Sequence, residues 1–216
     1  MKLHNCPLCS SQKTQLYHAD DTRQYHACLV CEFVFVPSDF HLNDVDEKSR
    51  YDLHNNDPND ANYRRFLSQV AKPLLERLPK EAKGLDFGCG PGPTLSIMFE
   101  EQGYTVDLFD KFYAQNNAVF NRKYDFITAT EVLEHLSQPS FELNRLYNML
   151  NPSGVLGIMT EMVSDNASFV DWYYKNDPTH IGFFSRASLQ RLASTWRAEI
   201  KILSSRVVLI TKTSTS

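Results

Sequence analysis

The chain has 216 residues, of which 42% are hydrophobic and 22% charged, and a formal net charge of −4. This composition is ordinary for a soluble globular protein and suits one core domain with a small appendage. We find no run of 18 apolar residues and no signal-like N-terminus, so we expect no membrane span and a cytoplasmic protein. The negative net charge argues against a nucleic-acid partner, because neutralisation of phosphates by basic residues supplies much of the affinity for nucleic acids.

Four of the five cysteines form two pairs, Cys6-x2-Cys9 and Cys28-x2-Cys31, with 18 residues between the pairs. This spacing is typical of a zinc site, in which each pair brings two sulfurs to one side of a tight turn. We prefer zinc to two disulfides because a cytoplasmic chain keeps its thiols reduced. Four thiolates fill the coordination sphere, so we expect a structural metal that folds residues 1–38 as a zinc-ribbon module.

A polar segment and an amphipathic helix follow this module. A turn at 57–60 precedes apolar residues at helical spacing, and Asp60 or Asn62 is placed to cap the helix. Pro73 predicts an interruption or a kink in that helix. We therefore treat residues 39–82 as a linker with its helix, and a solvated linker is one interpretation of the segment.

A short apolar strand pattern then ends in a turn, Leu85–Gly92, with glycine at every second position of its second half. Glycines let a ligand approach the main chain closely at the start of a helix. A dinucleotide site would require G-x-G-x-x-G, but the sixth position is proline when the count begins at Gly88 and leucine when it begins at Gly90. Asp86 before the glycines favours instead a ligand without phosphate and with a cationic end. We interpret Cys89 in this turn as a small packing residue.

Strand-like and helix-like patterns alternate from here on, which predicts parallel β-α-β units that bind ligands at the carboxyl ends of their strands. Only two serines separate the last two strands, so these strands form a hairpin and the last one enters antiparallel. Only 14 residues separate Asp110 from Asp125, so the third strand is short or absent, with 118–120 as its candidate. The predicted strands are 83–87, 105–109, 124–130, 154–160, 197–203 and 206–212, and the predicted helices are 92–102, 139–150 and 187–195.

Five segments in this order resemble the class I S-adenosylmethionine (SAM) dependent methyltransferases. The glycine turn resembles their first motif, and 106–110 resembles their second strand with its terminal acid. Residues 124–136 resemble the fourth strand and the helix start after it, 150–158 the start of the fifth strand, and 177–185 a late loop. The resemblance implies an α/β, Rossmann-like methyltransferase core at 83–216, with a mostly parallel sheet, preceded by the zinc ribbon.

The resemblance also implies SAM as the cofactor. Asp110 corresponds to the acid that accepts hydrogen bonds from the ribose hydroxyls, with a helix cap as its alternative role. Glu131 faces cofactor or acceptor, or else caps the following helix. The family's adenine-contacting acid has no counterpart here, and a family segment before the first strand often folds over the cofactor, which is the second interpretation of 39–82. The expected cofactor-binding residues are Asp86, Gly88, Gly90, Gly92, Asp110, Thr130 and Glu131.

Methyl transfer from a sulfonium needs a dry, aligned site, and it needs a base only where the acceptor must lose a proton. His180, in the polar and aromatic stretch 172–180, is the first candidate for this base, and His135 is the second. For His135 the alternative role is capping or packing at a helix start. The aromatic residues of the stretch line an acceptor pocket or form an ordinary buried cluster.

The sequence therefore leaves three hypotheses on function. The first is a SAM-dependent methyltransferase with a small-molecule acceptor, and a resemblance to zinc-containing deoxysugar methyltransferases adds sugar-like acceptors. The second is an RNA or protein methyltransferase that docks its substrate through the ribbon, although the ribbon carries only Lys2, Lys13 and Arg23 as basic residues. The third is a non-catalytic SAM-binding interaction protein.

Overall fold

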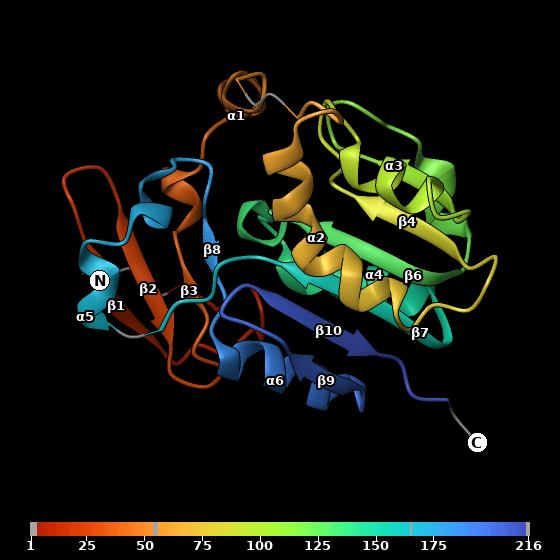
Figure 1. The fold of residues 1–216 in the computed structure, drawn as a ribbon. Helices are drawn as coiled ribbons and strands as arrows, with labels where there is room; N and C mark the ends of the chain where they lie inside the picture. The colour runs from red at the N-terminus through yellow and green to blue at the C-terminus, as the bar shows by residue number, and fades with distance from the viewer. Residues whose placement is uncertain (1–3, 54–55, 165, 215–216) are drawn as a thin grey trace.

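The centre of the molecule is a six-stranded sheet with the strand order β5-β4-β6-β7-β10-β9 (Figure 1). The computed structural model describes residues 4–53, 56–164 and 166–214. Neighbours among the first four strands of this order pair in parallel, and β10 runs antiparallel to both β7 and β9, as the hairpin predicts. The strands are β4 (Lys83–Phe87), β5 (Thr105–Phe109), β6 (Tyr124–Thr130), β7 (Leu150–Met159), β9 (Glu199–Ile202) and β10 (Val207–Thr211).

Helices cover both faces of this sheet, which confirms the predicted α/β fold. Val70 and Phe99, both fully buried, lie in the core on the face that α2 and α3 cover. Leu146 and Leu189 lie in the core on the opposite face, under α4 and α6. The helices are α2 (Ala61–Leu75), α3 (Thr94–Glu100), α4 (Pro139–Met149) and α6 (Arg186–Trp196).

The third strand of the family fold is absent from the described residues between β5 and β6. A 3-10 helix, η2 (Asn117–Asn121), takes its place and buries Val119 completely in the core. One isolated bridge joins Asp110 to Ala114. The segment is too short for a helix, a strand and two turns, so the prediction that the third strand is short or absent is confirmed. The candidate strand at 118–120 is wrong, because these residues belong to η2.

A second sheet joins the N-terminal module (residues 4–36) to the core. Its order is β1-β2-β3-β8, and β8 comes from the C-terminal half of the chain, beside β3 in Figure 1. Val34 pairs with Phe183 and Phe35 pairs with Gly182. The strands are β1 (Thr14–Ala19), β2 (Gln24–Cys28), β3 (Val34–Phe35) and β8 (Gly182–Phe183). Sequence analysis did not predict β8, because a two-residue strand has no periodicity to detect.

The segment between the module and α2 forms a 3-10 helix, η1 (Ser38–Phe40), and the helix α1 (Asp44–Tyr51). Asn43 caps α1 by accepting hydrogen bonds from two backbone amides of its first turn. No residue of α1 is buried, so side-chain contacts rather than a core hold it. Asp60 caps α2 as predicted, accepting from the amide of Asn62 at 2.8 Å.

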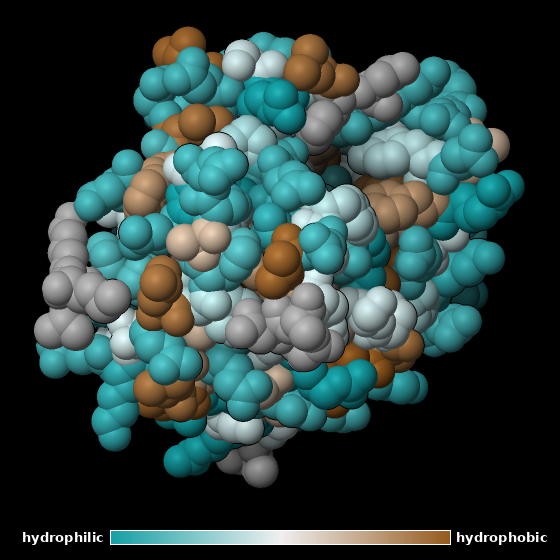
Figure 2. Space-filling model, turned by 90° about the vertical axis from the view of Figure 1, so that its left-hand side faces the viewer, coloured by the Kyte–Doolittle hydropathy of each residue, from teal (hydrophilic) through white to brown (hydrophobic). Residues whose placement is uncertain are grey.

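Three shorter helices complete the described chain: η3 (Leu133–His135), α5 (Asn166–Val170) and η4 (Tyr173–Asn176). Among the described residues, none of the helices combines the length and hydrophobicity that crossing a bilayer requires. Figure 2 shows the face that carries the N-terminal module: it is mostly hydrophilic, and its apolar residues form small, separate groups.

Candidate functional site

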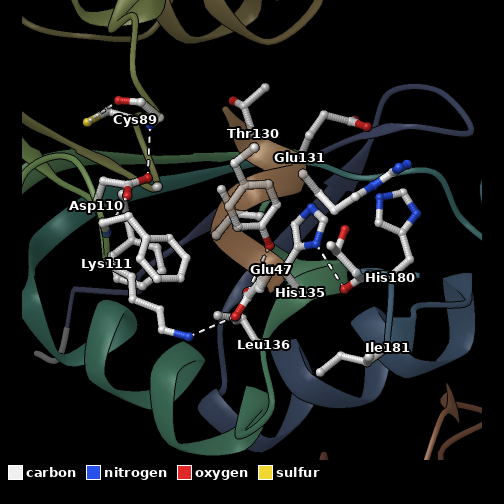
Figure 3. Close-up of a pocket in the computed structure, with 18 of the residues that line it drawn as sticks. Glu47, Cys89, Asp110, Lys111, Thr130, Glu131, His135, Leu136, His180 and Ile181 are labelled. Atoms are coloured by element: carbon white, nitrogen blue, oxygen red, sulfur yellow. Dashed lines mark hydrogen bonds and ion pairs between the residues drawn. The ribbon is translucent and has the colours of Figure 1, made fainter. Parts of the chain in front are cut away.

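A cavity of about 1080 Å³ lies at the carboxyl ends of β4, β5 and β6. Parallel α/β sheets bind ligands at this edge. In Figure 3, Cys89 and Asp110 lie at one end of the cavity, His135 and His180 lie at the other, and Thr130 is between them. Seven residues predicted from the sequence line it: Gly88, Gly90, Asp110, Thr130, Glu131, His135 and His180.

The glycine turn lies at one end of the cavity and requires two of its glycines. Gly88 and Gly90 have φ angles of +77° and +65°, a conformation that side chains disfavour. A Cβ at Gly88 would lie 2.3 Å from Cγ2 of Val132. The amide of Gly90 donates to Oδ2 of Asp110 at 3.0 Å, so the turn and the end of β5 are joined.

Gly92 lies apart from the cavity lining and meets the segment before α2 instead. A Cβ there would lie 2.4 Å from the carbonyl oxygen of Asn56. Oγ1 of Thr94 donates to the same oxygen at 2.9 Å. The absence of a side chain at Gly92 therefore lets the segment at Asn56 approach the glycine turn, and not a ligand.

Asp110 caps the turn after β5 and also lines the cavity. Its Oδ1 accepts from the amides of Phe112 at 2.7 Å and Tyr113 at 3.0 Å, which caps the turn after β5. Its Oδ2 accepts from Gly90, and the residue lines the cavity. A carboxylate has about four acceptor positions, so acceptor capacity remains for a ligand hydroxyl.

Asp86 is 4% exposed and lies beneath the cavity rather than in its wall. Oγ1 of Thr128 donates to its Oδ1 at 2.8 Å. Burial, aided by the nearby Asp110 carboxylate, raises the pKa of Asp86 to about 6. The residue is therefore neutral in mildly acidic solution and charged above about pH 6.

We expect Asp86→Asn to stabilise the protein above pH 6 and to change little below pH 4. The folded pKa of about 6 exceeds the ordinary value of about 3.9, so the stability gained from protonation is complete below pH 3.9 and lost as pH rises through 6. Asn resembles the protonated acid, so the gain should approach about 2–3 kcal/mol at pH 8. Thermal unfolding without ligand, at pH 4 and pH 8, measures it.

The exposed Asp171 provides the control for this prediction, and Asp171→Asn should leave both unfolding profiles unchanged. A stability difference between wild type and Asp86→Asn that is the same at both pH values would contradict the assigned titration.

Glu131 and Arg206 pair on the cavity wall, where both side chains are partly buried. Glu131 has a φ of +52°, and its Oε1 lies 3.2 Å from Nη1 of Arg206. Its Oε2 also lies 3.2 Å from the hydroxyl oxygen of Tyr174, whose single proton is donated to Glu134. Burial and the neighbouring Glu134 raise the pKa of Glu131 to about 8, against the opposing effect of Arg206. The N-cap residue of η3 is Val132, and no side chain caps this helix by a hydrogen bond. The alternative role of Glu131 as a helix cap is therefore wrong.

The two histidines lie together at the other end of the cavity, with ring centroids 4.8 Å apart. Nδ1 of His180 donates to the carbonyl oxygen of Tyr174 at 2.6 Å, and Nδ1 of His135 donates to that of Thr179 at 3.0 Å. A carbonyl only accepts, so in each neutral ring Nε2 is the basic nitrogen. Burial and the neighbouring His135 lower the pKa of His180 below its ordinary 6.5.

Glu134 supports this end of the cavity, and the sequence analysis assigned it no role. It is fully buried, and its carboxylate accepts hydrogen bonds from Tyr174 at 2.5 Å and Thr160 at 2.8 Å. Glu134, His135 and His180 have potential metal ligands within 4.8 Å of one another. Both oxygens of Glu134 already accept hydrogen bonds, so we interpret these three residues as part of a hydrogen-bond network and not as a metal site. The available signal in the sequence was a glutamate next to a histidine, a few residues after a strand.

Residues of the ranges 41–53 and 56–66 also line the cavity, and none of them is among the site residues predicted from the sequence. The ring of Tyr51 packs edge-on against His135 with centroids 5.1 Å apart, and Tyr63 also lines the cavity. Nζ of Lys111 holds α1 through ion pairs with Asp44 at 2.7 Å and Glu47 at 2.8 Å. This geometry agrees with a segment that folds over a ligand.

The four paired cysteines meet at a separate place in the N-terminal module. Their sulfurs lie within 4.8 Å of one another, with 3.6 Å between Cys6 and Cys31 and 3.5 Å between Cys9 and Cys28. Tetrahedral zinc with bonds of about 2.3 Å places its sulfurs about 3.8 Å apart. All five cysteines are free thiols, and Cys89 lies apart in the glycine turn. The donor set and its spacing fit Zn²⁺.

The sheet order and the cavity at its carboxyl edge define the Rossmann-like α/β fold of class I SAM-dependent methyltransferases. Residues 60–198 match the family described as "Methyltransferase domain". The chain belongs to this family.

Several known proteins resemble the chain. The 1,6-didemethyltoxoflavin-N1-methyltransferase of Burkholderia thailandensis, solved with 1,6-didemethyltoxoflavin and S-adenosylhomocysteine, has a TM-score of 0.54 and 16% identity, covering 86% of this chain and 98% of that one. A SAM-dependent methyltransferase of Methanosarcina mazei has a TM-score of 0.51 and 15% identity, covering 66% and 98%. The ubiquinone biosynthesis O-methyltransferase of Histophilus somni (strain 2336) is 29% identical over 106 residues, which are 46% of this chain and 43% of that relative.

Proposed function

We propose that this protein is a SAM-dependent methyltransferase with a small-molecule acceptor. The observation that carries the proposal is one cavity with a glycine turn and an acid at one end and two histidines at the other. Membership of the methyltransferase domain family supports it. The relative that holds 1,6-didemethyltoxoflavin supports a small acceptor, because its fold covers most of this chain.

The cofactor would lie between the glycine turn and Thr130. Gly88 and Gly90 leave the main chain open to the ligand, and the Asp110 carboxylate accepts from the ribose hydroxyls. Oγ1 of Thr130 is buried and has no hydrogen-bond partner within the described parts of the chain, so it is available to the cofactor. Asp86, below the wall, acts on the cationic end of the ligand through the turn and bridging water.

Glycine at position 90 provides the test of this cofactor site. We expect Gly90→Val to weaken SAM binding by at least ~100-fold, about 3 kcal/mol, because its side chain enters the ligand's space. Gly103→Val is the matched control: its φ is +88°, and nothing lies within 4 Å of its added Cβ. Both variants carry the backbone cost of a β-branched residue at positive φ, but only Gly90→Val should lose affinity by calorimetry.

Equal loss of SAM affinity in the two variants would show that backbone strain, not contact with the ligand, controls binding. Binding of NADH as tight as that of SAM would refute the cofactor assignment.

His180 is the proposed base. Its Nδ1 is held by the Tyr174 carbonyl, so Nε2 takes the proton as the acceptor's lone pair attacks. SAM bound at the glycine turn would supply the methyl group, with the neutral thioether as the leaving group. The lowered pKa keeps His180 neutral at pH 7, which is the form a base needs. His135, packed against the same ring, is the second candidate.

We place one structural Zn²⁺ on Cys6, Cys9, Cys28 and Cys31. Four thiolates close the coordination sphere, so the metal would supply folding energy and no chemistry on the acceptor. The proposed organisation is a zinc-ribbon module at 1–38, a linker and capping helix at 39–82, and the methyltransferase core at 83–216.

The acceptor can be identified directly. The protein is incubated with SAM carrying an isotope-labelled methyl group and a metabolite extract, and mass spectrometry identifies the labelled product. We expect a labelled small molecule and formation of S-adenosylhomocysteine, both absent with the Gly90→Val variant. Label found only in RNA or protein would contradict the small-molecule acceptor, and SAM binding without any transfer would contradict catalysis.

A further inference from the structure

A single arginine of the N-terminal module holds the loop that carries His180. Arg23 stands just before β2 and is 7% exposed. Its Nη1 donates to the carbonyl oxygens of Pro178 at 3.2 Å and His180 at 3.0 Å. Its Nη2 donates to those of Asp177 at 2.8 Å and Lys175. Four carbonyls of one loop therefore point at one guanidinium.

The fifth N–H of Arg23 completes the arrangement. Nε donates to the hydroxyl of Tyr25 at 2.8 Å, and that hydroxyl donates to Asp20 at 2.9 Å. A guanidinium has five N–H donors in a fixed plane, and here each has a partner. Nζ of Lys175 lies 3.7 Å from the same Asp20 carboxylate. Hydrogen bonds from a charged donor are stronger than neutral ones, and burial limits their competition with water.

The strand pairing fixes the other end of this loop. The amide of Val36, after β3, donates to the carbonyl of Ile181 at 2.9 Å, and β3 then pairs with β8. The amide of Ile181 donates to the carbonyl of Glu134 at 2.8 Å. Residues 175–183 are therefore held by the N-terminal module on one side and by the Glu134 segment on the other.

This loop sets the orientation of both histidines. The Nδ1 protons are accepted by the carbonyls of Tyr174 and Thr179. Tyr174 directly precedes the residues whose carbonyls Arg23 binds, and Thr179 lies among them. A change in the loop would move these acceptors, and with them the position and tautomer of each ring.

We infer that Arg23 is a positioning residue for acceptor chemistry, and that the N-terminal module shapes the acceptor end of the cavity. The inference rests on the proposed role of His180. The buried cation serves the protein's own backbone and is not presented to a partner. The hydrophilic face in Figure 2, with only scattered apolar groups, agrees with a module whose apolar side is used against the core.

The experiment compares Arg23→Gln, Arg23→Lys and, as the matched control, Lys13→Gln at an exposed position of the same module. Zinc content and SAM affinity report whether each variant is folded. We expect Arg23→Gln to lower kcat about 10- to 100-fold with SAM affinity within twofold of wild type, a smaller loss than the roughly 10²–10⁴-fold contribution of the base itself. Arg23→Lys keeps the charge but not the planar fork, so its kcat should be intermediate.

A readout independent of turnover uses NMR of isotope-labelled histidine. In Arg23→Gln the His180 ring should become more exposed, and its pKa should rise toward 6.5. Unchanged His180 resonances, or wild-type kcat in Arg23→Gln, would overturn the inference. If Arg23→Gln does not fold, Arg23→Lys decides by the same measurements. A His180 shift in Arg23→Gln, combined with normal turnover in His180→Ala, would instead refute His180 as the base.

Discussion

Removal of the proposed zinc from the four-cysteine cluster is expected to unfold the N-terminal module and to stop methyl transfer, while SAM binding is largely retained. Thiolate ligation of zinc in small modules contributes about 10–16 kcal/mol of coupled binding and folding. Without it, β1, β2 and β3 have too small a core to persist. The cofactor end of the cavity is built from β4, β5 and β6, so its contacts remain.

Chelation combined with hydrogen exchange tests this prediction. Amides of β2 and β3 should lose protection first, and β8 should follow because its partner strand is β3. Cys28→Ser should reproduce the effect, whereas Cys89→Ser, in the glycine turn, should keep the metal. Iron or no metal in elemental analysis of the purified protein would reject the zinc assignment.

His180→Ala should lower turnover by roughly 10²–10⁴-fold, the usual contribution of a positioned base, with SAM affinity nearly unchanged. The base works in its neutral form, so wild-type kcat should fall as pH drops through the His180 pKa, which lies below 6.5. The variant should lack this acid limb, and rising pH should partly restore its rate. Rate–pH profiles of both proteins at saturating SAM measure these effects.

His18→Ala is the matched control, since His18 lies on β1 and is absent from the cavity lining. An acid limb that persists in His180→Ala but disappears in His135→Ala would transfer the role to His135. Parallel losses of thermal stability and turnover in His180→Ala would mean that the residue only packs. An acceptor atom more than about 5 Å from His180, with no bridging water, would also exclude it.

Much of the fold was readable from the sequence because its signals are local. Strand and helix periods along the core predicted the α/β order, and two serines between the last strands required a hairpin. Chain length alone excluded a full third strand between Asp110 and Asp125, and η2 stands there. The predicted bounds differ mainly at β7, which begins at Leu150 because that residue pairs with Tyr124 of β6.

The candidate site was predicted in part, for the same reason. Residues at the ends of parallel strands must share one edge of the sheet, so Gly88, Asp110 and Glu131 meet as expected. Asp86 and Gly92 belong to the same motif, but Asp86 is buried in the core and Gly92 packs against Asn56. The direction in which each residue of a turn faces depends on dihedral angles that a motif does not specify.

By itself, the sequence determined the order of elements, the glycine turn and the cysteine pairs, because each depends on residues close together in the chain. Only the tertiary structure decided that Arg23 would meet carbonyls more than 150 residues away, and that β3 would find its partner in β8. Those contacts need polar atoms from distant segments to be buried together, and no periodicity or spacing along the chain encodes such an encounter.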